Sequence, residues 1–490
     1  MNKICVALFF AIATACVHAN KRDNAVVCDE KRCECNIEEI NCDDQNLNTA
    51  AIDPTVDPNG VKVLSMRSNQ LTQIKRQQIM MGKCTNLARL DLSNNLIHKI
   101  EDNAFDSMPR LEKLDLSSNK LTIIAESTFA GLSNLLDLKL DHNLIADLSN
   151  DSVFLTTPRL RYLSIDFTPI KSVDNETFIG LQSLIELSID HAELSRLPAD
   201  TFKPLSRLET LSLRHNRFVV IPMDELRWLP QLKRLDLSGN PILTINSNAF
   251  RRNSHLQNLY FYNMPALSYI EDCAFCNIHE LRTLEIVNCS KLVDIDPEAF
   301  GRDTMYFRSI ETIDLVNNSL STLEEDTMPW ENVTSIIRLA GNPWRCDCQL
   351  LWMINSSLKH DKLNLPSCAS PTRLKGRNVT SLDRIEPGLC IMTRLNTRIR
   401  AARVFLIAAI LIIIFGLITS SWYFFNNRRK NGFKVRNLFY KPQLPKYAYR
   451  NLAMGEELDQ DTSIVTNDGA SILPKSNRKA DLASRLAEEV

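Results

Sequence analysis

Apolar residues recur along the chain in the pattern L-x-x-L-x-L-x-x-N-x-L, which is clearest from Leu87 to Ile97. The frame opens again, mostly 24 or 25 residues apart, at Leu111, Leu135, Leu160, Leu184, Leu208, Leu232, Leu256, Leu281 and Ile310. A weaker first copy starts near Val61 and a last one near Thr334, which makes about 12 repeats. A period of this kind predicts a solenoid in which each repeat packs only against its neighbours.

Each L-x-x-L-x-L segment is expected to form a short strand, with leucines pointing inward and the residues between them pointing outward. Successive strands would stack in parallel, roughly 4.8 Å apart. The asparagine after each strand would pair backbone groups at the turn through its side-chain amide. This residue occurs at Asn95, Asn119, Asn143, Asn216, Asn240 and Asn318.

A second apolar spine with the same period is expected on the outer side of the solenoid. It consists of Phe105, Phe129, Phe154, Phe178, Phe202, Leu226, Phe250, Phe275 and Phe300. Two spines that share one period argue against a run of amphipathic helices. Other residues take the asparagine position at Thr168, Ala192, Met264 and Cys289. The step from Leu281 to Ile310 is longer, with residues 301–304 resembling an insertion, so we expect an irregular strand ladder there.

The two ends of the chain predict a secreted, membrane-anchored product. Residues 1–19 have the basic start, short apolar stretch and small-residue cleavage site of a secretory signal. Residues 404–425 are apolar without a charge, and as a helix they would span roughly 33 Å, enough to cross a bilayer. Basic residues flank both sides, so the signal sets the orientation. We expect a single-pass type I protein of the plasma membrane, with an extracellular N-terminus.

Cysteines cluster on both sides of the repeats. Four precede them, at Cys28, Cys33, Cys35 and Cys42, and four follow, at Cys346, Cys348, Cys368 and Cys390. An open solenoid end exposes its core, and disulfide-bonded lids are what a secreted chain would use. Zinc sites are disfavoured by the secretory signal, and spacing alone leaves three connectivities for each cluster.

The segment Asn342-Pro343-Trp344-Arg345-Cys346-Asp347-Cys348, followed by Leu351 and Trp352, resembles the C-terminal cap of extracellular leucine-rich-repeat proteins with cysteine-flanked ends. The resemblance covers roughly residues 28–390. It implies an α/β leucine-rich-repeat solenoid, a curved horseshoe with a parallel sheet on its concave face. It also implies the pairs Cys28–Cys35, Cys33–Cys42, Cys346–Cys368 and Cys348–Cys390. The predicted parts are an N-terminal cap (20–60), repeats (61–341), a C-terminal cap (342–390), a linker (391–403) and a disordered cytoplasmic tail (426–490).

Register within the repeats sorts the remaining cysteines of the mature chain. Cys84 falls at a position that is apolar in other repeats, and Cys289 takes the asparagine position. Both are expected to be buried, inert thiols. Cys273 and Cys276 flank Phe275 at positions that are polar in other repeats. Two exposed thiols in an oxidising compartment should pair, so we predict a Cys273–Cys276 disulfide. A redox-catalytic C-x-x-C is disfavoured, because no thioredoxin-like strand–helix unit surrounds it.

The outward strand positions of repeats four to seven form the candidate partner-binding site. Stacked like charges on adjacent strands repel, and the interpretation is that a basic partner, not the fold, requires them. The proposed residues are Asp141, His142, Tyr162, Asp166, Phe167, Glu186, Asp190, His191, Arg214 and His215. Charge reversal of the three aspartates is expected to weaken binding and to leave folding intact. The alternatives are a solvated acidic face or a calcium site, the latter disfavoured because rigid strands bring too few oxygens together.

A second candidate patch is apolar and aromatic, a composition that often marks interfaces. It consists of Tyr260, Tyr262, Val287 and Val316. Glycans at two nearby asparagines would crowd it. Seven N-x-S/T sequons are predicted glycosylation sites, at Asn150, Asn175, Asn288, Asn317, Asn332, Asn355 and Asn378.

Composition and motifs then narrow the function class. A net charge of −1 argues against general nucleic-acid or heparin binding. The sequence has no Walker loop, H-E-x-x-H or G-x-S-x-G, so we expect no enzyme, cofactor or metal site. In the tail, Tyr449-Arg450-Asn451-Leu452 resembles an endocytic Y-x-x-Φ signal, and Val490 could enter a PDZ groove.

The chain is similar to cell-surface leucine-rich-repeat adhesion and receptor proteins. That resemblance implies an extracellular protein ligand, bound on the concave face. The alternative is an auxiliary subunit that modulates a channel or receptor in the same membrane.

Overall fold

The computed structural model describes residues 33–51, 59–79, 85–148, 152–302, 306–307, 309–350, 352–353, 365–382, 413, 415–420 and 422. The chain divides into two compact units, Met1–Ala401 and Ala402–Val490. The first unit contains the repeats and the second contains a helical segment at residues 415–420.

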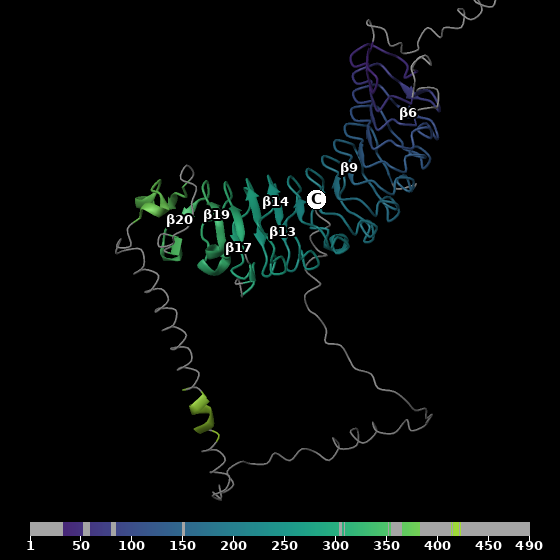
Figure 1. The fold of residues 1–490 in the computed structure, drawn as a ribbon. Coiled ribbons are helices and arrows are strands. Elements are labelled where there is room, and N and C mark those ends of the chain that lie inside the picture. Colours follow the sequence, from purple (N-terminus) through teal and green to yellow (C-terminus); the bar gives the residue numbers. More distant parts are fainter. Residues whose placement is uncertain are drawn as a thin grey trace, which may run out of the picture. The chain divides into compact units, whose positions relative to one another are not determined.

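One 14-stranded sheet follows the chain through the first unit (Figure 1). Its strands are β1 (Glu34–Cys35), β2 (Glu39–Asn41), β3 (Val63–Ser65), β5 (Arg89–Asp91), β7 (Lys113–Asp115), β8 (Asp137–Lys139), β9 (Tyr162–Ser164), β10 (Glu186–Ser188), β11 (Thr210–Ser212), β12 (Arg234–Asp236), β14 (Asn258–Tyr262), β16 (Thr283–Val287), β18 (Ile310–Asp314) and β19 (Val333–Arg338). Only the pair of β1 with β2 is antiparallel among these strands. The result is a parallel β-solenoid of about 13 turns, because β2 adds a turn ahead of the predicted repeats.

Equivalent repeat positions lie side by side throughout this sheet. Leu187 of β10, for example, pairs with Leu211 of β11. The irregularity expected at the longer step does not occur in the strand pairing, since Leu284 of β16 faces Ile313 of β18 in register. A shift occurs instead between β18 and β19. Inward-pointing apolar residues hold the register, because a one-residue slip would turn them outward.

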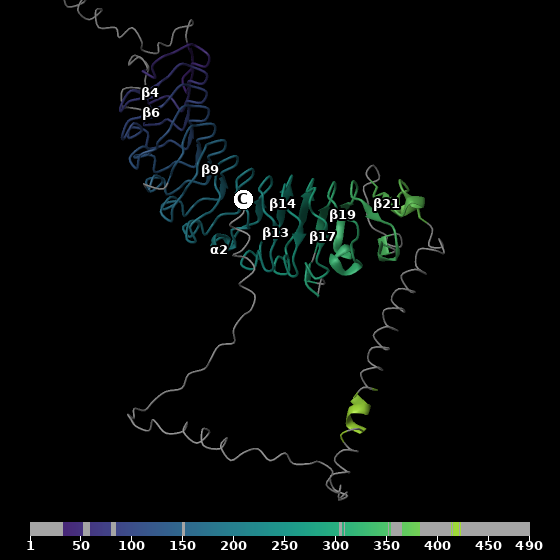
Figure 2. The same ribbon diagram turned by 180° about the vertical axis from the view of Figure 1, so that it is seen from behind.

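Shorter elements complete each turn away from the main sheet (Figure 2). They are β4 (Gln73–Ile74) paired with β6 (Lys99–Ile100), the sheet of β13 (Thr244–Ile245), β15 (Tyr269–Ile270) and β17 (Asp294–Ile295), and helix α2 (Met223–Leu226). The C-terminal part contains β20 (Trp344–Arg345) paired with β21 (Cys368–Ser370), and the 3-10 turns η3 (Glu325–Thr327), η4 (Trp330–Asn332), η5 (Cys348–Leu350), η6 (Thr372–Leu374) and η7 (Val379–Ser381).

Both predicted spines form the buried core. Every residue of the phenylalanine spine is buried, Leu226 included. Neighbouring rings lie 6.2 Å apart at Phe129 and Phe154, and 6.1 Å apart at Phe178 and Phe202. Full burial of one such side chain stabilises the fold by about 1.5–3 kcal/mol, and only the adjacent repeat supplies that cover.

The asparagine ladder is confirmed. Oδ1 of Asn95 accepts from the backbone N–H of Leu71 at 3.1 Å, and its Nδ2 donates to the carbonyl of Met66 at 3.0 Å. Asn69 and Asn342 extend the ladder at both ends. At the substituted positions, the Thr168 hydroxyl donates to the carbonyl of Ile165 and the Cys289 thiol to the carbonyl of Phe261.

Three predicted disulfides are confirmed, namely Cys33–Cys42, Cys346–Cys368 and Cys273–Cys276. Cys35 and Cys348 are also disulfide-bonded, and their predicted partners Cys28 and Cys390 lie outside the described residues. Cys289 is a buried free thiol, as predicted. Cys84 lies outside the described residues.

The predicted targeting and anchoring segments lie largely beyond what the structure describes. Residues 1–19, the linker 391–403 and the tail 426–490 fall outside it, as does most of the apolar segment 404–425. Within the residues that are described, no helix has the length and apolar character needed to span a membrane.

Candidate ligand-binding face

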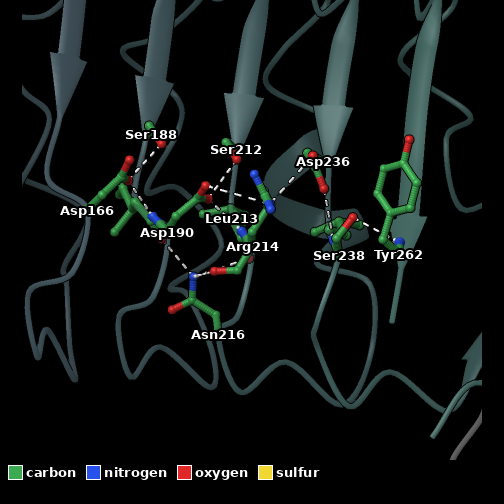
Figure 3. Close-up of polar contacts among 12 residues, drawn as sticks. Asp166, Ser188, Asp190, Ser212, Leu213, Arg214, Asn216, Asp236, Ser238 and Tyr262 are labelled. Carbon is green, nitrogen blue, oxygen red and sulfur yellow. Dashed lines mark hydrogen bonds and ion pairs between the residues drawn. The ribbon is translucent and has the colours of Figure 1, made fainter. Parts of the chain in front are cut away.

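The ten residues predicted for the main site come together on the outward side of the sheet, between β8 and β12. Tyr162 and Glu186 begin neighbouring strands β9 and β10 and are exposed. Asp166, Asp190 and Arg214 follow the ends of successive strands and lie side by side (Figure 3). The repeat register therefore assembles the predicted columns.

The three aspartates form hydrogen bonds within the fold. Oδ1 of Asp166 accepts from the hydroxyl of Ser188 at 2.7 Å and from the backbone N–H of Asp190 at 2.6 Å (Figure 3). Asp190 makes the same two bonds one repeat later, with Ser212 at 2.6 Å and the N–H of Arg214 at 2.7 Å. Each carboxylate thus links its own repeat to the next one.

The same bridge recurs at Asp141, which accepts from Ser164 and from the N–H of Asp166. The premise that the fold does not use these aspartates is therefore wrong, and we now expect their charge reversal to affect folding as well as binding. The backbone N–H beyond each strand requires an acceptor, and a carboxylate supplies it. In some other repeats the acceptor comes from within the repeat, as where Asp115 accepts from the N–H of Ser117 at 2.9 Å.

The sequence contains a signal for aspartates that bridge two repeats. A bridging aspartate is followed in the next repeat by a serine at the last strand position, as in Asp141 with Ser164 and Asp190 with Ser212. The cap shows the same combination, since Asp43 accepts from Ser65 and from the N–H of Arg67.

Burial and hydrogen bonding act in opposite directions on these carboxyl groups. Burial raises the pKa of Asp190 to about 6, against the lowering effect of its bonds with Ser212 and Arg214. Burial likewise raises the pKa of Asp141. Nε of Arg214 lies 4.0 Å from Asp190 and 3.8 Å from Oδ2 of Asp236, so this guanidinium lies between two carboxylates.

A column of four stacked rings runs beside the aspartates. Ring centroids are 4.4 Å apart for His142 and Phe167, 4.2 Å for Phe167 and His191, and 4.2 Å for His191 and His215. Phe167 is 47% exposed. Burial, followed by the charges of His215 and Arg214, lowers the pKa of His191. The column ends at Gly239, where any Cβ would collide with the ring of His215.

The second candidate patch is half-buried. The rings of Tyr260 and Tyr262 stack at 5.9 Å, and the guanidinium of Arg234 lies 4.3 Å from the Tyr260 ring centroid. Arg234 also donates to the Tyr260 hydroxyl at 2.9 Å. Val287 and Val316 are half-buried beside them, so this patch offers less accessible surface than the ring column.

The sequons differ in accessibility. Four of their asparagines are exposed, at Asn175, Asn288, Asn317 and Asn378, and Asn332 is half-buried. Asn150 and Asn355 lie outside the described residues. The Nδ2 of Asn317 donates to Asn288 at 3.0 Å, so these two side chains form a surface amide ladder. In the part of the chain that is described, no cluster of His, Cys, Asp or Glu could hold a metal ion.

Comparison with known proteins agrees with this repeat architecture. The leucine-rich-repeat family model matches residues 85–145, 158–218 and 230–290. A phospholipase A2 inhibitor from Gloydius brevicaudus siniticus is 37% identical over 78 residues, which are 15% of this chain and 23% of the inhibitor. The chain thus matches less than a quarter of that relative's length.

Several solved structures are also similar. The crystal structure of a TLR13–ssRNA13 complex gives a TM-score of 0.40 at 19% identity, over 68% of this chain and 62% of that one. A complex of latrophilin 3, Unc5D and FLRT2 gives a TM-score of 0.45 at 20% identity, over 73% of this chain and 98% of that one. A leucine-rich-repeat protein of Leptospira interrogans gives a TM-score of 0.48 at 21% identity, over 64% of this chain and 82% of that one.

Proposed function

We propose that this leucine-rich-repeat protein is a cell-surface receptor or adhesion molecule that binds another extracellular protein on the outward face of its sheet. One observation carries the proposal: the face from β8 to β12 displays accessible aromatic side chains next to carboxylates. Tyr162 is 41% exposed and Phe167 is 47% exposed. Aromatic residues within a polar surround are typical of protein interfaces.

The cell-surface location rests on the sequence. Residues 1–19 have the features of a secretory signal and residues 404–425 those of a membrane anchor. Disulfides in both caps support an oxidising compartment. In the proposed topology, Tyr449-Arg450-Asn451-Leu452 and the C-terminal Val490 would face an endocytic adaptor and a PDZ domain in the cytoplasm.

An auxiliary subunit of a channel or receptor is the second candidate function. The observation in its favour is the short linker, residues 391–403, between the C-terminal cap and the apolar segment. So short a connection would hold the repeats close to the bilayer, within reach of a neighbour in the same membrane. Crosslinking in mixed cultures distinguishes the two, because an adhesion partner is recovered from the opposite cell.

The proposed function is tested by screening the full-length chain against a panel of extracellular domains, then repeating the positive interactions with a variant of the sheet face. Tyr162→Thr with Glu186→Thr introduces the residue that β11 carries at the same place, Thr210. We expect the affinity to fall at least about tenfold, as for central interface residues. Ile123→Thr, at a 76% exposed position outside the strands, is the matched control. Equal affinity in all three proteins would place the binding site elsewhere.

A further inference from the structure

The four stacked rings occupy backbone positions that large side chains normally avoid. His142, Phe167, His191 and His215 have φ between 52° and 55°, in the left-handed region. Glycine, asparagine and, to a lesser extent, histidine adopt this conformation, whereas a bulky residue such as Phe167 is rarely found there. In other repeats this position carries small or amide side chains, namely Asn94, Ser118, Gly239, Asn263, Asn288 and Asn317.

The fold has an easier solution for this position and uses it in neighbouring repeats. Asn288 donates to Asn263 at 3.1 Å, and Asn317 donates to Asn288 at 3.0 Å. Those amides link adjacent turns without exposing apolar surface. The ring column replaces them with stacking, but leaves Phe167 nearly half exposed. Folding alone therefore does not account for Phe167 at this position, and contact of its exposed ring with a ligand would.

The charge beside the rings selects the ligand. Oδ1 of Asp141 and of Asp166 accepts hydrogen bonds from the next repeat. Oδ2 of Asp166 accepts only a long bond from the Ser164 hydroxyl, at 3.4 Å, so a stronger donor from a partner could take its place. Among the described residues, neither carboxylate forms an ion pair with lysine or arginine. Glu186 is exposed on the adjacent strand. A neutral imidazole adds a nitrogen acceptor, so the surface accepts hydrogen bonds and attracts cations.

We infer that the ring column and the adjoining carboxylates form one docking strip, which binds an arginine-bearing extended segment of the protein partner. The inference rests on the proposed function and names the chemistry of its ligand. The planar guanidinium fits because it can donate to a carboxylate and to an imidazole nitrogen together. The methylene stem of the same arginine can pack against the exposed edge of the Phe167 ring.

The test uses two synthetic peptides, one of alternating arginine and serine and one of alternating glutamate and serine, with the purified full-length chain. The variant Phe167→Asn with His191→Asn removes two rings and introduces the residue that this backbone favours. Ser118→Asn is the matched control, because it changes the same position one repeat before the column begins. Binding is measured by fluorescence anisotropy and stability by thermal unfolding.

We expect the arginine peptide to bind the wild type and the control, and to bind the double variant at least about tenfold more weakly. The melting temperature of the double variant should equal or exceed that of the wild type. Unchanged affinity, equal binding of the glutamate peptide, or a clear drop in melting temperature would each overturn the inference. A screened extracellular partner that still binds the double variant would overturn the docking strip and leave the proposed function standing. If the arginine peptide binds but the screen yields no extracellular partner, the proposed function is overturned and the chemistry of the docking strip stands.

Discussion

Replacing Asp166 by alanine would test whether the outward carboxylates hold the solenoid together. The change removes the acceptor of two bonds, at 2.7 Å from the Ser188 hydroxyl and 2.6 Å from the Asp190 N–H. A hydrogen bond to a charged group contributes about 1.5–3 kcal/mol to stability. Water can reach this half-buried site, so in the variant it would form hydrogen bonds with the Ser188 hydroxyl and the Asp190 N–H and recover part of that energy. We therefore expect a loss of about 2–3 kcal/mol in the free energy of unfolding.

Two further variants separate hydrogen bonding from charge and from position. Asp166→Asn keeps an acceptor at Oδ1 and should cost about 1 kcal/mol. Ser117→Ala alters the equivalent position two repeats earlier, where Asp115 accepts from the backbone N–H of Ser117. This variant loses only the bond from the Ser117 hydroxyl, so it should lower the free energy of unfolding by about 0.5–1 kcal/mol. The measurement is urea unfolding of the full-length chain by circular dichroism, with amide exchange at Asp190 as a local readout. Equal losses in all three variants, or unchanged exchange in Asp166→Ala, would refute the bridging role.

Three other outcomes are expected. Gly239→Ala should destabilise the chain by about 1–3 kcal/mol in thermal unfolding, because φ is +75° there and the new Cβ meets the His215 ring. The Cys289 thiol should resist labelling at pH 8 until the chain unfolds, because it is buried and burial raises its pKa to about 11. Binding of the arginine peptide should weaken as the pH falls from about 7.5 to 5, because Asp190, whose pKa burial raises to about 6, loses its negative charge beside the strip. Asp190 and His191 have opposite effects on the pH dependence of stability. The raised pKa of Asp190 stabilises the fold below pH 3.8, and this stabilisation is lost as the pH rises through about 6. The lowered pKa of His191 stabilises the fold above pH 6.5, and that stabilisation is lost as the pH falls through its lowered pKa.

The sequence predicts this fold well because one constraint repeats in every turn. A leucine-type residue such as Leu187 can be buried only if the next repeat places Leu211 beside it, so the period determines strand position and register together. The asparagine ladder follows from the same geometry, since every turn leaves similar backbone groups to pair. The longer step into Ile310 does not follow this rule, because β16 and β18 pair in register across it although more residues separate them.

The sequence predicted the position of the candidate site but not the hydrogen bonds that its aspartates form within the fold. The columns of outward residues follow from strand alternation, so Asp166 and Phe167 were correctly placed. Whether a carboxylate faces solvent or a backbone N–H depends on where the strand ends, and hydrophobic periodicity does not specify that. The left-handed conformation at Phe167 was equally hidden, because the residue type there argues against it.

The aspartate column and the ring column lie side by side but contribute differently to folding, so mutations in them have different meanings. Charge reversal at Asp166 would break the contact with Ser188 as well as any contact with a ligand, so lost binding would not locate a site. Phe167 is the opposite case. Its ring stacks on the rings of His142 and His191 in the same column, and asparagine suits its backbone better. A loss of binding at that position without a loss of stability can come only from the surface that the ring presents.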